Sequence, residues 1–227
     1  MSPVKIPHKA ATPSIACPAP PIAASAAISA GQVVKLSAGK VISAVAAETG
    51  AVLGIAAENH PGAADVLNPR ANGTEILVYD NPELIFECPV PVIEAAAANS
   101  SATAVAAKSG EVAATTADDA FNGGVLVLKS KASGSTNTDP VGKRMDITDY
   151  AKTNLVFTKA SGGVANAGDR YEVYPPVGFT AGALDSSGFA RLLVSATGAT
   201  SVKVVGHDYD RHMIRCKAAK HALASST

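Results

Sequence analysis

Short runs of Val, Ile and Leu recur along most of the chain, separated by turns that contain glycine, proline, asparagine or aspartate. Within many runs apolar and polar residues alternate with a period of two, which is typical of half-buried β-strands. The pattern predicts strands at residues 32–36, 41–45, 52–56, 74–79, 84–90, 125–129, 145–147, 154–158, 170–174, 189–194 and 202–205. No helix long enough to cross between parallel strands is indicated, so an all-β sandwich or barrel is favoured over a Rossmann-like fold.

Two of the connections between these runs are well defined. Ser37-Ala38-Gly39-Lys40 places a glycine between the first two runs, which predicts a β-hairpin. Asp80-Asn81-Pro82-Glu83 combines three turn-forming residue types ahead of the run at 84–90, and it predicts a tight turn. In that run Phe86 is expected to point into the core.

Two regions do not have the strand pattern. Residues 92–120 are rich in alanine and are interrupted at Asn99-Ser100-Ser101, which predicts short helical turns or loops that cover a sheet edge. Residues 2–29 mix proline with alanine, and proline disfavours both a helix and an inner strand. This segment is expected to be an extended arm, either disordered or ordered by a partner.

The chain therefore divides into a Pro/Ala-rich arm at 1–29, a β-rich body at 30–210 and a basic C-terminal tail at 211–227. Whether the body splits into two β subdomains near 92–124 stays open at this point. The expected fold class is all-β, with a sandwich or a jelly-roll-like barrel as the core and with the arm and the tail extending from it.

The composition shows what this core is made of. Although 47% of the residues are hydrophobic, 45 of the 227 residues are Ala, aromatic residues make up only 4%, and Trp is absent. Val, Ile and Leu must therefore supply most of the core, because Ala buries little area. Charged residues, at 17%, fall below the usual quarter, which suggests that much of the surface meets other protein.

The formal net charge of zero conceals an uneven distribution of charge. Residues 1–30 and 211–227 contain Lys and Arg but no acid, so the middle of the chain has a net charge of −6. Basic ends on an acidic body are either solvated tails or arms that dock on acidic neighbours, including copies of the same chain. The residues expected to make such contacts are Lys5, His8, Lys9, Arg211, Arg215, Lys217 and Lys220.

No catalytic, cofactor or metal site is predicted. The chain has no Gly-x-Ser-x-Gly elbow and no glycine spacing of a phosphate loop, so the motifs of acyl-transfer and nucleotide enzymes are missing. One cluster, at residues 207–212, contains His and Asp side chains of the kind that bind metal ions. If it were a strand, Asp208, Asp210 and His212 would share one face. A metal ion there is a weaker hypothesis than a strip of salt bridges or a solvated edge.

Further classes of protein are disfavoured by the sequence. No apolar run reaches the roughly 18 residues of a membrane helix, and prolines interrupt any signal-peptide core near the N-terminus. Cys17, Cys88 and Cys216 are odd in number and widely spaced, which favours a reducing compartment over a disulfide framework or a zinc site. The zero net charge disfavours nucleic acid as a partner.

Two stretches of the sequence resemble a known class of proteins. Ala30-Gly31-Gln32-Val33-Val34-Lys35-Leu36, then Gly39-Lys40-Val41 and Val52-Leu53-Gly54-Ile55-Ala56-Ala57-Glu58, form a Gly-polar-Val-Val strand, a turn and a Leu-Gly-Ile-Ala strand. Residues 75–87 contain a Tyr-Asp-x-Pro turn ahead of a Phe-Glu strand, and residues 141–147 loosely continue the pattern. The chain resembles the capsid cement and decoration proteins of tailed bacteriophages, well over residues 30–90 and weakly over 120–175.

The resemblance implies a structural virion protein, not an enzyme, that stabilises the phage capsid shell through non-covalent contacts with the major capsid protein. It also implies a homo-oligomer, most often a trimer, made in the bacterial cytoplasm and located on the capsid surface, with no cofactor and no membrane partner. The alternatives are a phage head-fibre or tail component and a carbohydrate-binding β-sandwich. The last of these is poorly supplied with aromatic platforms, since the chain has five Tyr and no Trp.

Overall fold

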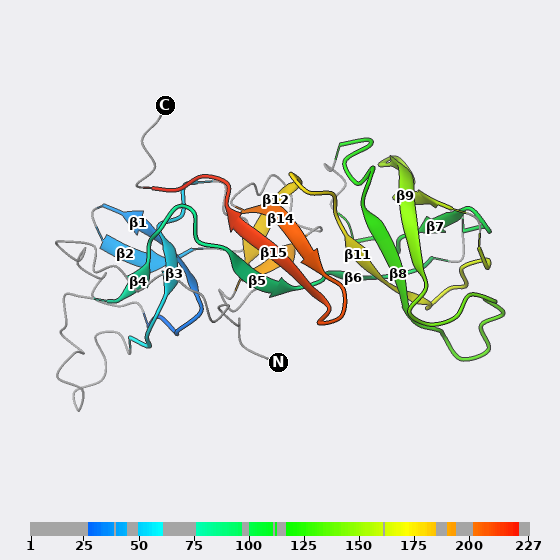
Figure 1. Ribbon diagram of the computed structural model, residues 1–227, viewed down its shortest axis with the longest axis horizontal. Helices are drawn as coiled ribbons and strands as arrows, with labels where there is room; N and C mark the ends of the chain where they lie inside the picture. The colour runs from blue at the N-terminus through cyan, green and yellow to red at the C-terminus, as the bar shows by residue number, and fades with distance from the viewer. Residues whose placement is uncertain are drawn as a thin grey trace.

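The computed structural model describes residues 27–38, 40–44, 50–60, 76–96, 100–110, 112, 117–160, 162–184, 190–193 and 202–222. These residues form three antiparallel β-sheets and no helix, which confirms the all-β prediction. The sheets follow one another along the long axis of the molecule (Figure 1). Residues 1–26 of the predicted arm, with Lys5, His8 and Lys9, lie outside the described residues.

The first sheet is built from the first two predicted turns and the strands around them. It contains, in the order β2-β1-β3-β4, the strands β1 (Val33–Ser37), β2 (Lys40–Ser43), β3 (Gly54–Ala56) and β4 (Val78–Tyr79). The predicted hairpin joins β1 and β2, with Ser37 opposite Lys40. The predicted turn after β4 is also present, because the Leu84 amide donates to the Asn81 carbonyl at 2.9 Å.

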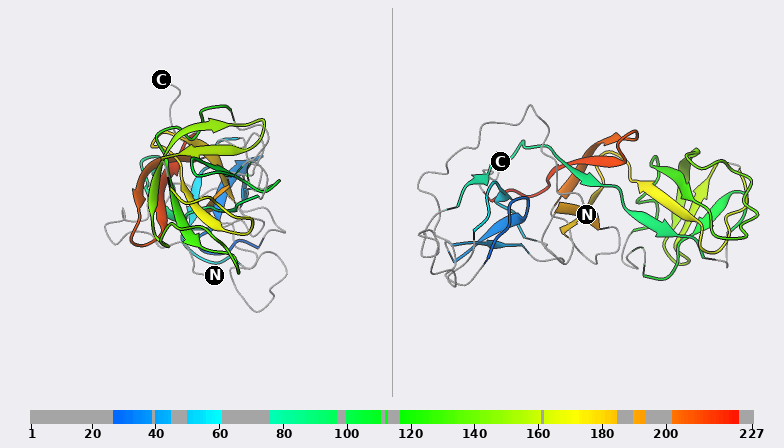
Figure 2. Two further views of the ribbon diagram at one scale, coloured as in Figure 1. Left: turned by 90° about the vertical axis from the view of Figure 1, so that its right-hand side faces the viewer. Right: turned by 90° about the horizontal axis from the view of Figure 1, so that it is seen from below.

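The six-stranded sheet is the largest of the three, with the order β6-β11-β8-β9-β10-β7. Its strands are β6 (Val92–Glu94), β7 (Ala104–Ala106), β8 (Val125–Ser130), β9 (Arg144–Ala151), β10 (Val156–Lys159) and β11 (Arg170–Tyr174). The sheet curls so strongly that its edge strands meet, and Ala95 and Ala107 form a bridge between them (Figure 2). The Ala96 amide donates to the Ala106 carbonyl at 2.8 Å beside this bridge.

The prediction of short helical turns or loops within residues 92–120 is wrong at two places, because residues 92–94 and 104–106 form the strands β6 and β7. Ile93 on β6 and Val105 on β7 are fully buried in the core. Pairing of β6 with β11 and of β7 with β10 decides the backbone conformation here. Tertiary pairing overrides the helix propensity of the neighbouring alanines.

The five-stranded sheet lies between the other two in space and has the order β13-β12-β14-β15-β5 (Figure 1). Its strands are β5 (Phe86–Pro89), β12 (Thr180–Leu184), β13 (Ala190–Leu193), β14 (Val202–Asp208) and β15 (Met213–Ala218). Because β5 comes before the six-stranded sheet in the sequence and the others follow it, the six-stranded sheet is an insertion. The chain crosses at Val90-Pro91 and returns at Pro175-Pro176, so the division that sequence reasoning considered near 92–124 falls inside the inserted sheet instead.

The predicted basic tail at 211–227 also differs from the structure. Residues 213–218 form β15, an inner strand that pairs with β14 on one side and with β5 on the other. Ile214 and Cys216 are fully buried, whereas Arg215 between them is exposed. This alternation explains why the segment folds as a strand in spite of its positive charge.

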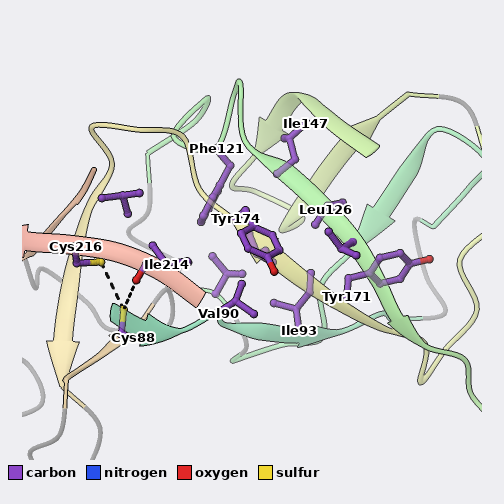
Figure 3. Packing of buried hydrophobic residues seen from close by; sticks show 14 of the residues in the cluster. Cys88, Val90, Ile93, Phe121, Leu126, Ile147, Tyr171, Tyr174, Ile214 and Cys216 are labelled. Atoms are coloured by element: carbon purple, nitrogen blue, oxygen red, sulfur yellow. Dashed lines mark hydrogen bonds between the residues drawn. The ribbon is translucent and has the colours of Figure 1, made fainter. Parts of the chain in front are cut away.

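One apolar core runs through all three sheets, and Figure 3 shows the part of it between the five-stranded and six-stranded sheets. Its members include Val33 and Ile55 of the first sheet, Phe86 and Ile214 of the five-stranded sheet, and Ile93 and Leu126 of the six-stranded sheet. Phe86 is 5% exposed, which confirms its predicted place. Phe121 packs its ring against Tyr150, Phe157 and Phe179 at centroid distances of 4.8, 5.1 and 4.9 Å. Since Phe179 directly precedes β12, these rings connect the six-stranded and five-stranded sheets.

The first sheet has a second apolar cluster on its other face, formed by Ile28, Val34, Val41, Leu53, Ala56, Ile76 and Val78. Ile28 is held there by two main-chain hydrogen bonds with His60, at 2.8 and 2.6 Å. The C-terminal segment returns to this sheet after β15. The Val52 amide donates to the Lys220 carbonyl at 3.0 Å, and the Ala222 amide donates to the Val52 carbonyl at 2.8 Å.

Gly54 should tolerate no side chain, because a Cβ atom there would overlap the Tyr79 carbonyl oxygen in the neighbouring strand. We expect Gly54→Ala to lower the free energy of unfolding by about 2 kcal/mol or more, since either β3 or β4 must move. Chemical denaturation measures the effect. Gly206→Ala in β14 is the matched control, because its Cβ would lie 3.8 Å from the nearest heavy atom. Equal stability of the two variants would contradict the described β3–β4 contact.

Candidate interaction surface

The β14–β15 hairpin carries most of the described residues that the sequence singled out. β14 ends at Asp208, residues 209–212 form the turn, and His212 has a φ of 54°. The hypothesis that Asp208, Asp210 and His212 share one strand face is therefore wrong, because the strand stops before the last two. Within the described part of the chain no group of three or more His, Cys, Asp or Glu side chains is placed to hold a metal ion.

Arg211 and Arg215 cover a buried carboxylate on β5. Glu87 points away from the core side of β5, yet it is only 1% exposed, because the two arginines lie over it. Arg211 Nη1 is 2.8 Å from Glu87 Oε2, and Arg215 Nε donates to Glu87 Oε1 at 3.4 Å. Both guanidinium groups also lie within 4 Å of Asp208 Oδ2, at 3.7 and 3.6 Å. Four side chains thus form one charge network across β5 and the hairpin.

The remaining predicted cations divide between the described and undescribed parts of the chain. Lys217 on β15 donates to Glu83 Oε2 at 3.0 Å, beside the turn that precedes β5. Lys220 is exposed and bonds through its carbonyl to the Val52 amide. Arg211, Arg215 and Lys217 therefore make contacts within the chain, and they are not the free basic arm that sequence reasoning expected.

A second buried carboxylate ties the tip of the hairpin to the six-stranded sheet. Glu172 on β11 is 1% exposed, and its Oε2 lies 2.8 Å from His212 Nδ1. The Tyr174 hydroxyl donates to the same oxygen at 3.2 Å, while Lys129 Nζ is 3.3 Å from Oε1. Glu172 therefore has partners from both sheets, and these offset the cost of burying its charge.

Aromatic rings extend the same joint. Tyr209 in the turn packs on Tyr174 with ring centroids 4.6 Å apart, and the Arg144 guanidinium lies 4.3 Å from the centre of the Tyr209 ring. His207 Nε2 contacts the Pro175 carbonyl at 2.7 Å, at the crossing between the sheets. Burial raises the pKa of the Tyr209 hydroxyl. The joint therefore combines a buried charge, a cation–π contact and tilted aromatic rings in contact.

A third buried carboxylate organises the loop between β8 and β9. Asp169 accepts hydrogen bonds from the Ala132 and Asn166 amides, the Asn137 side chain and the Ser135 hydroxyl, at 2.9 to 3.2 Å. Burial by itself raises the pKa of Asp169, but these donors outweigh it and lower the pKa below the ordinary 3.8. Asn137 also donates to the Tyr171 hydroxyl at 2.9 Å.

Lys159 is a buried amine at the end of β10. Its Nζ donates to the carbonyls of Ala102 and Gly163 at 2.8 and 3.2 Å. Burial lowers the pKa of Lys159, although the nearby Asp139 carboxylate acts in the opposite direction. The amine is bonded to main-chain oxygens on two sides, so it holds Gly163 against the loop at Ala102.

Sequence reasoning missed the acids that make these networks. Glu87 lies between Phe86 and Cys88, and Glu172 lies between Tyr171 and Val173. An acid inside an apolar strand run is the signal that could have identified each of them, because a charge is rarely buried without a partner. Which basic residue would supply that partner depends on pairing between distant strands and is not visible in the sequence.

No protein-family model, curated protein or solved structure matches the chain. No helix in the described segments has the length and apolar character needed to cross a membrane. What the chain does must therefore be argued from its own residues and their arrangement.

Replacing both arginines over Glu87 should destabilise the fold. We expect Arg211→Ala/Arg215→Ala to lower the free energy of unfolding by about 1–3 kcal/mol, less than for a fully buried pair because both arginines are half exposed. Adding Glu87→Gln should restore part of the loss, since it removes the uncompensated charge. Urea denaturation of the three proteins measures this coupling. Arg170→Ala, which removes an exposed ion pair 4.0 Å long, is the control. If stability is unchanged in the double variant, the arginines are available for an outside partner instead.

Asp169→Asn should lower stability at neutral pH, because an amide nitrogen would face groups that are themselves donors, at a cost of about 1–3 kcal/mol. The pKa of Asp169 is depressed in the folded state, so its contribution is complete above pH 4 and is lost as the pH falls through the folded pKa. The difference between native and variant should therefore shrink near pH 3. Denaturation at both pH values tests this, with exposed Asp149→Asn as the control; a constant difference would contradict it.

Proposed function

We propose that this protein is a structural component of a tailed-phage virion, which binds the capsid shell and stabilises it as a cement or decoration protein. The main support for the proposal is that the two stretches that resemble phage capsid proteins lie next to each other in the structure. Ile55 pairs with Tyr79 and Ala56 with Val78, so the Leu-Gly-Ile-Ala strand of the first stretch lies beside the Tyr-Asp-x-Pro turn of the second. Two motifs that were recognised separately therefore form one structural unit.

The glycine of that unit has a physical reason to be there. Gly54 lies directly against the Tyr79 carbonyl, and this close approach is available only to a residue without a Cβ atom. The adjoining turn leads straight into β5, so the unit is continuous with the five-stranded sheet. A resemblance whose motifs depend on each other structurally is better support than two isolated short patterns.

The shape of the molecule supports the same proposal. Three sheets in a row share one apolar core, and buried charge networks fix two of them to each other. Such a body resists bending between its ends, as a clamp between capsid subunits must. Exposed apolar side chains occur beside the first sheet, where Leu36 and Leu77 are each 37% exposed, and directly before β5, where Ile85 is 43% exposed. They offer contact area for a protein partner.

In this proposal the partners are the major capsid protein and further copies of the chain, with a trimer as the expected oligomer on the capsid surface. The protein is made in the host cytoplasm before it joins the virion. The N-terminal arm, without residues 27–29, which belong to the first sheet, carries inter-subunit contacts through Lys5, His8 and Lys9. The C-terminal cations have a smaller part than the sequence indicated, because Arg211, Arg215 and Lys217 are paired within the chain.

Binding to capsids tests the proposal. Purified empty heads of the phage that encodes the protein are incubated with the full chain and, separately, with a variant that lacks residues 1–26. The amount of protein bound to the heads is then measured after gradient sedimentation. The deletion stops at 26 because Ile28 belongs to the core of the first sheet. We expect the full chain to saturate the heads and to raise their melting temperature, and we expect the deletion to reduce occupancy at least about tenfold.

The outcomes separate the parts of the proposal. If the full chain does not bind heads, the cement function is wrong, and imaging of whole virions then distinguishes a head-fibre or tail position. If both proteins bind equally, the arm has no role in attachment. The unfolding temperature of the free deletion variant should equal that of the full chain, which shows that any lost binding is not due to unfolding.

A further inference from the structure

Two thiols without a part in the proposed function lie side by side in the core of the five-stranded sheet. Cys88 on β5 and Cys216 on β15 have their Sγ atoms 3.5 Å apart (Figure 3). Both side chains are buried, at 1% and 0% exposure. The register places Ile214 opposite Cys88, so the two cysteines are diagonal neighbours on the core side of adjacent antiparallel strands.

This arrangement is close to the geometry of a bond. A disulfide needs an S–S distance of about 2 Å, so the sulfur atoms have to approach by about 1.5 Å. The thiols already point toward each other (Figure 3), but diagonal neighbours lie farther apart than directly opposite residues, so closing the bond also needs a small movement of β5 toward β15. The Cys88 thiol also donates to the Ile214 carbonyl at 3.7 Å, a weak bond whose loss costs little.

We propose that Cys88 and Cys216 form an oxidation site, where hydrogen peroxide converts the thiol pair to a disulfide that links β5 to β15. One sulfur, as thiolate, attacks a peroxide oxygen; the O–O bond breaks, hydroxide leaves, and a sulfenic acid forms. The second thiolate attacks that sulfur, the S–O bond breaks, and hydroxide leaves again. The two thiol protons and the two hydroxides give two water molecules. Two electrons pass from the sulfurs to the peroxide.

The position of the pair controls how fast it reacts. The hydrogen bond with Cys88, together with burial, raises the pKa of the Cys216 thiol well above its ordinary value, so little thiolate exists in the closed structure. Among the described residues, β5 is the last strand in the order of its sheet and is hydrogen-bonded to β15. Local separation of β5 exposes both sulfurs. Oxidation should therefore be slow in buffer and faster in urea concentrations that leave the protein folded.

The Cys88–Cys216 disulfide would stabilise the fold by linking two strands that are far apart in the sequence. The two cysteines are 128 positions apart, and the whole inserted six-stranded sheet lies between them in the sequence. Closing so long a loop restricts the unfolded chain strongly. We expect the melting temperature of the oxidised protein to rise by about 5–15 °C. The inference does not depend on the virion function, since it concerns contacts inside one chain.

The experiment uses the full chain with Cys17→Ser, which leaves only the two core thiols. After treatment with hydrogen peroxide in mild urea, we expect a mass loss of about 2 Da and a linked peptide pair containing Cys88 and Cys216. The count of free thiols in denaturant should fall from two to none, and dithiothreitol should reverse each change. Cys17→Ser/Cys88→Ala and Cys17→Ser/Cys216→Ala are the controls, and neither should gain thermal stability on oxidation.

Other results would overturn the inference. Two free thiols after oxidation, mass gains of about 16 Da for each added oxygen, or disulfide-linked dimers would show that the pair does not close within the chain. A disulfide that forms without a rise in melting temperature would contradict its stabilising role. Because the mass and the peptide link are read on the protein that keeps both cysteines, the test stands even if an alanine variant folds poorly.

Discussion

The three sheets are held in one row by the β14–β15 hairpin, because its two ends reach different neighbours. At its turn, His212 contacts Glu172 of the six-stranded sheet at 2.8 Å. Beyond β15, the chain bonds to Val52 of the first sheet. Between these ends, β15 pairs with β5, the strand that comes before the inserted sheet. The arrangement of the sheets therefore depends on a segment near the C-terminus, which must fold back over most of the chain.

The buried acids make this arrangement specific. Glu87 and Glu172 are each 1% exposed. Glu87 pairs with Arg211 and Arg215 of the hairpin, and Glu172 contacts His212 at its turn as well as Lys129 of its own sheet. A hairpin packed in another register would move Arg211 and Arg215 away from Glu87 and His212 away from Glu172, at a cost of about 1–3 kcal/mol at Glu87, where the arginines are half exposed. Apolar packing alone tolerates small shifts, but a buried ion pair does not. The charge networks thus select one position for the hairpin among several that the apolar core would permit.

The sequence indicated most of the strands and turns but not how they assemble. Runs with large alternating apolar side chains, such as 32–36 and 170–174, became β1 and β11 almost residue for residue. β7 was missed because its alanines give no strand signal of their own and need a partner strand to define them. β6 contains no alanine, but its three residues, Val92–Glu94, form too short a run to be separated from the Ala-rich stretch that follows. β15 was missed for another reason. Its alternation of Ile214 and Cys216 with basic residues was visible, but the positive charge of residues 211–220 was given more weight than the period of two.

The emphasis on positive charge also explains why residues 211–227 were predicted to be an interaction surface. The sum of charges over residues 211–227 indicated a free basic arm, whereas Glu87, Asp208 and Glu83 balance its cations locally. A count of charge along the sequence cannot separate a solvated cation from one that neutralises a buried acid 128 positions away. The cations of the hairpin are thus engaged within the chain. In the proposed function, attraction to an acidic partner is therefore assigned to Lys5 and Lys9 of the N-terminal segment, which lies outside the described residues, instead of to the hairpin.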